Sequence, residues 1–317
     1  MVKTSIIILN YNTAAYAEEL VGSLARNIPL DEYEVILADN NSPEKSFREI
    51  GKKYPFVKIL EFESNEGFAT GNNKASEFAE GEYLLFINPD VLINENNLHL
   101  LHEYLEANPD TGIVSGLMVD TDNKPIYCFN SFPDIEWEIY QFAGTGYDAK
   151  IRKLLSRDEI KSNSNFETDW FHGAFIFISK YNFKALKGFN EKYFMYYEDI
   201  ELCYSVKNKL GLKNVCIPEV KYIHHTRATF SDVKKDDIYY FHINRGKMIF
   251  ISNYGLFLRS ILELISISSI ILRILVLPFW NKYRNLKKQK FVQLLKVIRL
   301  HASSKYLSSS KFEYIKR

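Results

Sequence analysis

Three polar segments follow directly after apolar, β-branched runs in the first third of the sequence. They are Asn10-Tyr11-Asn12, Asp39-Asn40-Asn41-Ser42 and Asn88-Pro89-Asp90. A fourth polar segment, residues 65–73, opens an expected helix and contains Gly67 and Gly71. Glycine lets a ligand approach the backbone closely, and a helix N-terminus favours anionic groups. Together these segments could cradle a nucleotide diphosphate.

Two adjacent carboxylates, Glu198 and Asp199, stand at the start of a segment with helical spacing. A carboxylate in such a place can take a proton from an attacking hydroxyl group. Each acidic residue also has a structural interpretation. Asp39 and Asp90 lie in sequences that form turns, and acidic residues favour the N-terminus of any helix.

The scaffold for these residues is predicted by alternating strand and helix patterns. The expected strands are residues 5–9, 34–38, 57–62, 83–87 and 112–119, and the expected helices are residues 14–27, 47–54, 67–80 and 98–107. Such alternation indicates an α/β protein with a mainly parallel sheet, whose ligands bind at the carboxyl ends of the strands. The polar segments lie at these ends.

The later sequence is less regular. We expect an irregular, aromatic-rich region over residues 120–169, a strand over 171–179, a helix over 199–210, a strand over 215–225 and helices from 239 onward.

The composition is that of a globular protein, with 46% hydrophobic and 25% charged residues among 317, which excludes a disordered or collagen-like chain. Three cysteines are too few for a disulfide scaffold and indicate a reducing compartment. The apolar run at residues 6–9 is too short for a secretory leader, so we expect a buried strand there.

Charge is distributed unevenly along the chain. Residues 281–317 carry eleven Lys and Arg against one Glu, whereas the whole chain has a net charge of +1. The apolar residues before them contain Arg259, Glu263 and Arg273, which predicts a poor spanning helix. We expect residues 256–317 to lie on an anionic membrane surface. Packing on the protein, or a homodimer interface, would also explain the pattern. Nucleic acid is not expected as a partner, because no basic groove with interleaved aromatic residues is evident.

Six segments, in order, resemble family 2 glycosyltransferases with the GT-A fold. Four are residues 5–12, 38–42, 65–73 and 87–90. Trp170-Phe171-His172-Gly173-Ala174 resembles a W-x-x-G-A motif, and residues 188–203 resemble a G-F-[DN]-E-x-[FY]-F-x-Y-x-E-D motif. The resemblance covers roughly residues 3–250 and is closest to rhamnosyltransferases of bacterial surface-polysaccharide assembly. It implies a Rossmann-like mixed sheet flanked by helices, with a C-terminal helical extension.

The resemblance implies a nucleotide-diphosphate sugar as donor. Asp39 would accept a hydrogen bond from the N3–H of uracil or thymine. The other residues implied to line the nucleotide are Asn10, Tyr11, Asn12, Asn41, Asn65, Gly67, Phe68, Asn73 and Asn88.

The resemblance also implies a divalent cation, Mg²⁺ or Mn²⁺. Asn88-Pro89-Asp90 resembles a D-x-D motif in which the last Asp binds the metal, with Asn88 replacing the first Asp. His224 would be a second ligand, and strand alternation allows only one of His224 and His225 to face the cleft. Arg227 and His225 are candidates for contacts with the diphosphate, and Arg227 stands where the family usually has Gly.

On the acceptor side, Asp199 is implied to be the base and Glu198 to orient or contact the acceptor. Trp170, His172 and Gly173 would line the acceptor face, although a packed core Trp170 is an equal alternative. Glu201 and Ser205 stand where the family often has Asp and Arg. The implied reaction is a single inverting displacement. The Q-x-x-R-W motif of processive enzymes is absent, so we expect one sugar per encounter.

We therefore expect a glycosyltransferase that uses dTDP-rhamnose or a UDP-sugar and a glycan or lipid-linked acceptor. It would be cytoplasmic, at the inner face of the cell membrane. Residues 1–255 would form the catalytic domain, with nucleotide-binding and acceptor-binding halves that meet near residue 119, and residues 256–317 the basic tail. The alternatives are a non-catalytic sugar-nucleotide or glycan-binding partner and a sugar-1-phosphate nucleotidyltransferase. The latter needs a Gly-rich basic loop where Asn10-Tyr11-Asn12 stands. The sequence leaves homo-oligomers open.

Overall fold

The computed structural model describes residues 2–143, 147–225, 233–279 and 287–302, which divide into two compact units. Unit 1 takes the described residues up to 132, residues 152–191 and residues 198–225. Unit 2 takes the described residues of 133–151, residues 192–197 and the helices from residue 233 onward. The predicted functional boundary after residue 255 stays a prediction.

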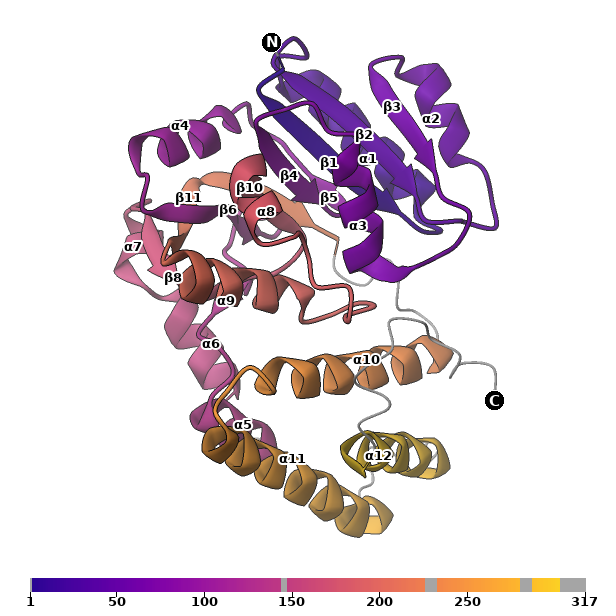
Figure 1. Cartoon of the computed structure of the whole chain (residues 1–317), viewed down its shortest axis with the longest axis vertical. Helices are drawn as coiled ribbons and strands as arrows, with labels where there is room; N and C mark the ends of the chain where they lie inside the picture. Colours follow the sequence, from indigo (N-terminus) through magenta and orange to yellow (C-terminus); the bar gives the residue numbers. More distant parts are fainter. Residues whose placement is uncertain (1, 144–146, 226–232, 280–286, 303–317) are drawn as a thin grey trace. The chain divides into compact units, whose positions relative to one another are not determined.

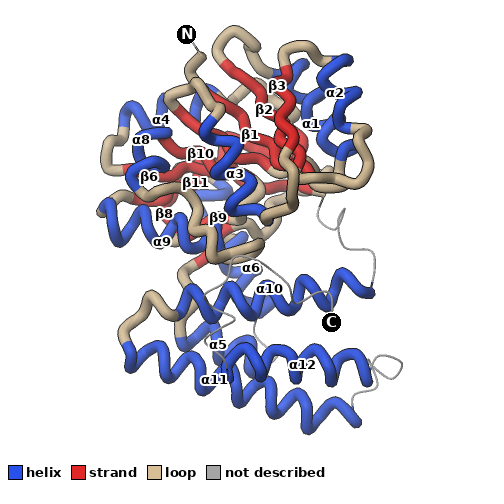
Figure 2. The backbone as a smooth tube through the Cα atoms, turned by 45° about the vertical axis from the view of Figure 1, so that its right-hand side comes forward, coloured by secondary structure: helices blue, strands red, loops and turns tan. Residues whose placement is uncertain are grey.

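Unit 1 is built on a nine-stranded sheet in the order β3-β2-β1-β4-β10-β6-β11-β5, with β8 beside β11 (Figures 1 and 2). Its strands are β1 (Thr4–Asn10), β2 (Tyr33–Asp39), β3 (Val57–Glu61), β4 (Tyr83–Ile87), β5 (Val91–Leu92), β6 (Thr111–Val119), β8 (Phe166–Thr168), β10 (Phe175–Ser179) and β11 (Lys213–His224). Two further short strands, β7 (Phe129–Asn130) and β9 (Trp170–Phe171), pair with each other.

The sheet is mixed, as expected. Strands β3, β2, β1 and β4 are parallel, whereas β10 runs antiparallel to both of its neighbours, β4 and β6. β1 and β6 are buried almost throughout, which requires cover on both faces. The parallel register places Asn10 opposite Asp39, so two of the polar segments meet at one edge of the sheet.

The helices predicted for the first third of the chain are confirmed, with small shifts at their ends. The helices of unit 1 are α1 (Ala14–Asn27), α2 (Phe47–Lys53), α3 (Gly67–Glu77), α4 (His99–Ala107), α7 (Asp158–Lys161), α8 (Lys180–Ala185) and α9 (Glu198–Leu210), and α6 (Tyr147–Leu155) bridges the two units. The ring of Phe86 on β4 packs on Phe183 and Phe189 at centroid distances of 4.8 and 4.9 Å. This aromatic cluster joins the sheet to the segment before α9.

Two expectations for the middle of the chain were wrong. Residues 120–169 are not irregular throughout, because they contain α6, α7, β7, β8 and α5 (Ile135–Ala143). The expected strand over 171–179 is broken at residues 172–174. β9 leaves the main sheet to pair with β7, and the main-sheet strand restarts at Phe175. Short strands of this kind depend on distant partners and leave little local pattern.

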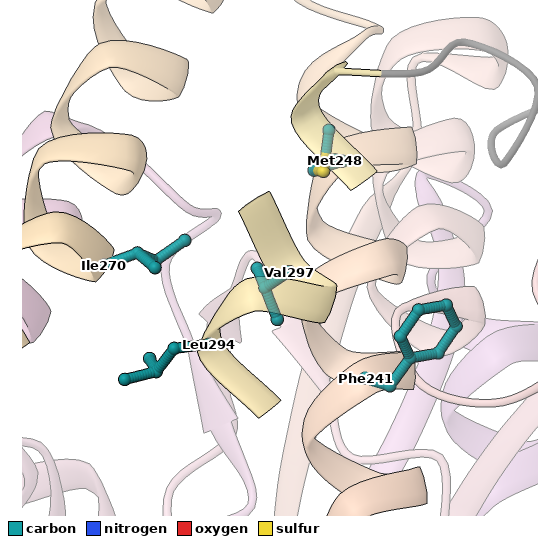
Figure 3. Close-up of a cluster of buried hydrophobic side chains, with 5 residues drawn as sticks. All are labelled: Phe241, Met248, Ile270, Leu294 and Val297. Atoms are coloured by element: carbon teal, nitrogen blue, oxygen red, sulfur yellow. The ribbon is translucent and has the colours of Figure 1, made fainter. Parts of the chain in front are cut away.

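Unit 2 is helical and contains α5, α10 (Val233–Ile251), α11 (Leu256–Val276), a 3₁₀ turn η1 (Leu277–Phe279) and α12 (Lys287–Ala302). The buried side chains of Phe241, Met248, Ile270, Leu294 and Val297 join α10, α11 and α12 (Figure 3). Lys247 and Glu138 form a buried ion pair at 2.8 Å that ties α10 to α5. The expected C-terminal helices are confirmed.

By length and composition alone, residues Leu256–Phe279 could cross a membrane, with a mean hydropathy of 2.2 over an 18-residue window. This differs from the expectation of a poor spanning helix. Arg259 and Glu263 pair with each other at 2.8 Å, which reduces the cost of carrying both charges on an apolar helix. Only 28% of the window is buried.

A strained turn precedes α9. Tyr196 and Tyr197 have φ angles of +67° and +75°, a left-handed conformation that bulky residues rarely adopt. Gly246 of α10 packs against this turn. A Cβ atom at position 246 would lie 2.6 Å from the Tyr196 carbonyl oxygen and 3.0 Å from Tyr197 Cβ. The absence of a side chain at Gly246 therefore allows the turn to be held against α10.

Gly246→Ala tests this close approach. In an ordinary helix interior the change stabilises by about 1 kcal/mol. Here we expect it to lower the free energy of unfolding by roughly 1–3 kcal/mol, because the added methyl group overlaps the Tyr196 backbone. Denaturant unfolding of both proteins measures the difference.

Gly255→Ala is the matched control, since nothing lies within 4 Å of a Cβ atom there. A stabilised Gly246→Ala protein would contradict the tight packing of the turn.

Candidate active site

The predicted nucleotide-binding side chains begin at the carboxyl ends of β1 and β2. Asp39 is fully buried, and its carboxylate accepts a hydrogen bond from the Asn10 amide at 2.7 Å. The Ser42 hydroxyl and backbone N–H donate to the same carboxylate at 2.6 and 2.8 Å. These bonds close the turn after β2, so Asp39 does have the structural role of a turn residue. A carboxylate has about four acceptor sites, so these bonds leave about one, and Lys45 Nζ lies 3.7 Å from Oδ2 as an ion-pair partner.

Asn40, which the sequence reasoning did not select, ties this turn to the start of α3. Its amide donates to the side-chain oxygen of Asn65 at 3.0 Å and to the Gly67 carbonyl at 3.1 Å. The Asn65 side chain also accepts from the Gly67 N–H at 3.0 Å. The only sequence signal for Asn40 was its position inside the Asp-Asn-Asn-Ser segment. The structure thus brings the second and fourth polar segments together.

Tyr11, Asn12 and Asn41 are exposed around this buried network. Asn12 and Asn41 have φ angles of +57° and +63°, in the left-handed region that Asn tolerates better than most residues. An exposed ring and two exposed amides beside a buried carboxylate suit the polar edges and faces of a nucleoside. Their contacts with a nucleotide stay predictions.

Phe68 and Asn73 of α3 contact the segment before α9. The Phe68 ring packs edge-on against Phe189 at 5.8 Å, and Asn73 exchanges two hydrogen bonds with the Phe189 backbone, at 2.8 and 2.9 Å. Gly188 has φ +76°, and a Cβ atom there would lie 2.4 Å from Asn73 Oδ1. Both side chains therefore have a structural role here, and their predicted nucleotide contacts stay predictions.

The predicted metal ligands Asp90 and His224 are brought together by β5, a strand that the sequence pattern did not predict. β5 begins directly after Asp90 and pairs with the end of β11, with Val91 opposite His224. His224 Nε2 lies 3.0 Å from Asp90 Oδ1, and both side chains are about nine-tenths buried. His225 instead has its ring 6.1 Å from that of Tyr16.

Asp90 offers a carboxylate, which suits Mg²⁺ and Mn²⁺, and His224 offers an imidazole, which is more typical of later transition metals. Within residues 2–143, 147–225, 233–279 and 287–302, no group of three or more metal-ligating side chains occurs. Two protein ligands are enough where substrate phosphates and water complete the shell of the cation. The pair therefore fits a divalent cation that is bound together with a diphosphate. Asn88 lies on the same loop, and its backbone N–H donates to the Ala174 carbonyl at 3.0 Å.

The break between β9 and β10 has a direct consequence for Asp199. Because residues 172–174 leave the sheet, the Gly173 N–H is free to donate to Asp199 Oδ2, at 2.7 Å. The Ile200 N–H donates to Asp199 Oδ1 at 2.8 Å. A Cβ atom at Gly173 would lie 3.2 Å from both Asp199 Cβ and Asp199 Oδ2. The carboxylate is thus held in one orientation by two backbone donors.

Glu198 has a different environment from Asp199. Glu198 is buried, and its Oε2 atom has no hydrogen-bond partner. Burial, and then the charge of Asp199, raise the pKa of Glu198 well above its usual range. Burial also raises the pKa of Asp199, but the charge of His172 and the N–H groups of Ile200 and Gly173 act against this rise. Of the two, Glu198 has the more strongly raised pKa.

The next predicted acceptor residue, His172, lies beside His224. Its ring centroid is 5.6 Å from that of His224, and its pKa is lowered mainly by burial, with Asp199 opposing. Trp170 is buried, and its indole N–H donates to the Ser131 carbonyl at 2.8 Å. Trp170 therefore packs in the core, as its structural interpretation predicted. The acceptor contacts of Trp170, His172 and Gly173 stay predictions.

The remaining predicted residue, Arg227, lies outside the described residues. Among the others, Asn10 and Asp39 belong to a turn network after β2. Asp90, His224, His172 and Asp199 form a second group in unit 1, which we call the carboxylate–histidine group. A partly buried carboxylate fixed by backbone donors can act as a base. The Asp90–His224 pair can bind a cation that neutralises a phosphate leaving group.

The chain is similar in fold to the mannosyltransferase PcManGT from Pyrobaculum calidifontis, solved in complex with GDP-Man and Mn²⁺. The TM-score is 0.59 at 16% sequence identity, and the match covers 96% of this chain and 88% of the other. This likeness confirms the expected fold, a mixed sheet of GT-A type flanked by helices.

Two relatives are similar in sequence. The chain is 24% identical over 234 residues to the N-acetylglucosaminyl-diphospho-decaprenol L-rhamnosyltransferase of Mycobacterium tuberculosis, covering 69% of this chain and 75% of that protein. It is 27% identical over 237 residues to rhamnosyltransferase WbbL of Escherichia coli, covering 71% and 85%. A family model described as glycosyl transferase family 2 matches residues 5–174, more than half of the chain. The chain is therefore a glycosyl transfer enzyme and belongs to glycosyl transferase family 2.

Proposed function

We propose that this enzyme moves one sugar from a nucleotide-diphosphate sugar to an acceptor hydroxyl, with inversion at the anomeric carbon. The observation that carries the proposal is that two backbone N–H groups fix the orientation of the Asp199 carboxylate. This carboxylate interacts electrostatically with His172, whose ring lies 5.6 Å from that of the predicted metal ligand His224. In a single displacement the acceptor oxygen attacks from the side opposite the nucleotide. Asp199 accepts the proton of that hydroxyl.

Glu198 has a complementary role in this proposal. Because its pKa is raised, it carries a proton and can donate a hydrogen bond to an acceptor oxygen. Two ionised carboxylates side by side would repel each other, so a neutral Glu198 also leaves the negative charge on Asp199. The adjacent residues thus divide the tasks of orienting and deprotonating the acceptor.

The donor side is built around Asp90, His224 and Asp39. Asp90 and His224 would hold Mg²⁺ or Mn²⁺, which when bound offsets the charge that develops on the diphosphate leaving group. Asp39 would accept from the N3–H of a pyrimidine, and Tyr11, Asn12 and Asn41 would surround the nucleoside. His225 and Arg227 would contact the diphosphate.

The preferred donor in this proposal is dTDP-rhamnose, with UDP-sugars next. Support comes from two relatives named as rhamnosyltransferases, one of which is named for a diphospho-decaprenol acceptor. We accordingly propose a lipid-linked or glycan acceptor in cell-surface polysaccharide synthesis. The enzyme would then work in the cytoplasm, at the inner face of the membrane.

Calorimetric titration with dTDP, UDP, GDP and ADP, with and without Mn²⁺, tests the donor side. We expect Mn²⁺ to strengthen binding of dTDP or UDP, whose N3–H can donate to Asp39, and we expect no binding of ADP, because adenine has no ring N–H on that edge. GDP should bind more weakly than dTDP or UDP. Asp90→Asn should remove the effect of Mn²⁺. Asp158→Asn, at a fully exposed site, is the control. A preference for GDP or ADP would contradict the role of Asp39.

Asp199→Asn tests the base. The amide keeps the size of the carboxylate but cannot accept the proton, so we expect transfer to fall by about 10²–10⁴-fold. Nucleotide affinity should not change. Initial rates and calorimetry on the same preparations give both quantities.

Gly173→Ala tests the position of the same carboxylate. The variant leaves Asp199 intact, but the added methyl group displaces its carboxylate. We expect a loss of the order of 10²-fold in kcat. If Asp199→Asn turned over at the wild-type rate, Asp199 would not be the base.

Glu198→Gln tests the protonation of Glu198 through stability. The folded-state pKa of Glu198 is raised above its unfolded value of about 4.3. Folding therefore becomes less favourable as pH rises from the unfolded pKa toward the folded one. Glutamine cannot ionise, so we expect the variant to be more stable than wild type at neutral pH. The gain should shrink toward zero as pH falls to about 4. Thermal unfolding from pH 4.5 to 8 measures this, with the exposed Glu219→Gln as control. A gain that did not depend on pH would rule out a raised pKa.

A further inference from the structure

The outward half of α11 is apolar and carries no charged residue. The exposed fractions of its largest side chains are 80% for Leu256, 81% for Phe257, 66% for Leu264 and 64% for Leu275, and Phe279 of η1 is 82% exposed. At 100° per residue these positions fall on one half of the helix. The other exposed positions on that half are Ser260, Ser268, Ile271 and Leu272. We call these nine residues the α11 face.

The charged residues of α11 lie on its opposite half. Arg259, Glu263 and Arg273 share that half with the buried Leu262, Ser266, Ser269 and Ile270. Ile270 points into the cluster with Leu294 and Val297 of α12 (Figure 3). A helix on the surface of a soluble protein has the reverse arrangement, with apolar residues inward and charges in water.

A contiguous exposed apolar surface on a folded protein marks a binding surface. The positions of Leu264 and Leu275, three turns apart on one side, show that the face extends along the helix. A short peptide groove is not formed, because these side chains project from a single convex helix. The shape suits a broad, flat partner.

We propose that the α11 face docks on a lipid bilayer with anionic headgroups. The charge of the following sequence selects this partner. Eleven Lys and Arg and one Glu lie in residues 281–317, and α12, within that stretch, packs beside α11. Basic residues next to an apolar helix face bind anionic lipids. A second copy of the chain fits less well, because the same face would bring two strongly basic segments together.

The helix lies in the membrane surface and does not cross it. Its inner half is occupied by α5 and α12. Arg273 and the Arg259–Glu263 pair lie on that half, so crossing would require α11 to leave unit 2. Docking of the outer half alone keeps these contacts. The docking itself does not depend on the proposed function. Its purpose does rest on that function, because docking would bring the enzyme to a lipid-linked acceptor.

Vesicle flotation of the full chain tests the proposal. The probe is phosphatidylcholine vesicles with and without phosphatidylglycerol. We expect binding to the anionic vesicles, and we expect the double variant Leu264→Gln and Leu275→Gln to bind at least about tenfold more weakly, because it removes apolar area from the centre of the face. The control is Tyr181→Gln, which changes an equally exposed apolar residue (82%) on α8 of unit 1.

Several results would overturn the proposal. One is no flotation of the wild type, and another is equal flotation of the double variant, which would assign binding to the basic segment alone. A wild-type dimer that the double variant dissociates, seen by sedimentation velocity, would show that a second copy covers the face. Resistance to alkaline extraction would show a spanning helix. Nucleotide titration of the same variants keeps the two proposals apart, because its outcome depends on unit 1.

Discussion

The constraint on which the site depends is that the carboxylates of Asp39, Asp90, Glu198 and Asp199 are wholly or largely removed from water and must find partners for their charge. Asp39 accepts from Asn10 and Ser42. Asp90 pairs with His224, and Asp199 accepts from two backbone N–H groups. Glu198 is the exception, because its Oε2 atom has no hydrogen-bond partner. Burial, and then the charge of Asp199, raise the pKa of Glu198 well above its usual range. The two adjacent and chemically similar carboxylates thus differ in how strongly their pKa values are raised.

The partners come from irregular features of the fold. A continuous strand over 171–179 would use the Gly173 N–H in the sheet, and Asp199 would lose its 2.7 Å hydrogen bond. The pairing of β5 with the end of β11 places Asp90 beside His224. The strained turn at Tyr196 and Tyr197 directly precedes Glu198, the first residue of α9. Strain of this kind persists only where surrounding structure fixes it, and the bare backbone of Gly246 provides the close packing within unit 2.

The long strands and helices of the first third could be predicted from the sequence, whereas the short strands and the helices of residues 135–161 could not. The strands with continuous β-branched runs and the helices between them were predictable because their patterns are local, and the polar residues after β1, β2 and β4 marked the site. β5, β7 and β9 have two residues each, and their pairing is determined by distant segments. The helices over 135–161 were missed for a related reason. α5 depends on α11 and on the Glu138–Lys247 ion pair, which no local pattern reveals. Asn40 stood in a predicted turn, yet only the structure shows that it joins that turn to α3.

The charged residues of α11 show what the sequence order alone does not reveal. In the sequence, Arg259, Glu263 and Arg273 interrupt an apolar run and argue against a helix that crosses a membrane. In the structure, all three lie on the half of α11 that faces the other helices of unit 2, and Arg259 and Glu263 form an ion pair. What matters to a membrane is the composition of the outward half, which contains only aliphatic, aromatic and serine side chains. Because a helix segregates residues by angle and not by order, a run with three charges can still present a charge-free surface. The charges then do not oppose lipid contact. The contacts of the inner half with α5 and α12 are what keep that side of the helix with the protein.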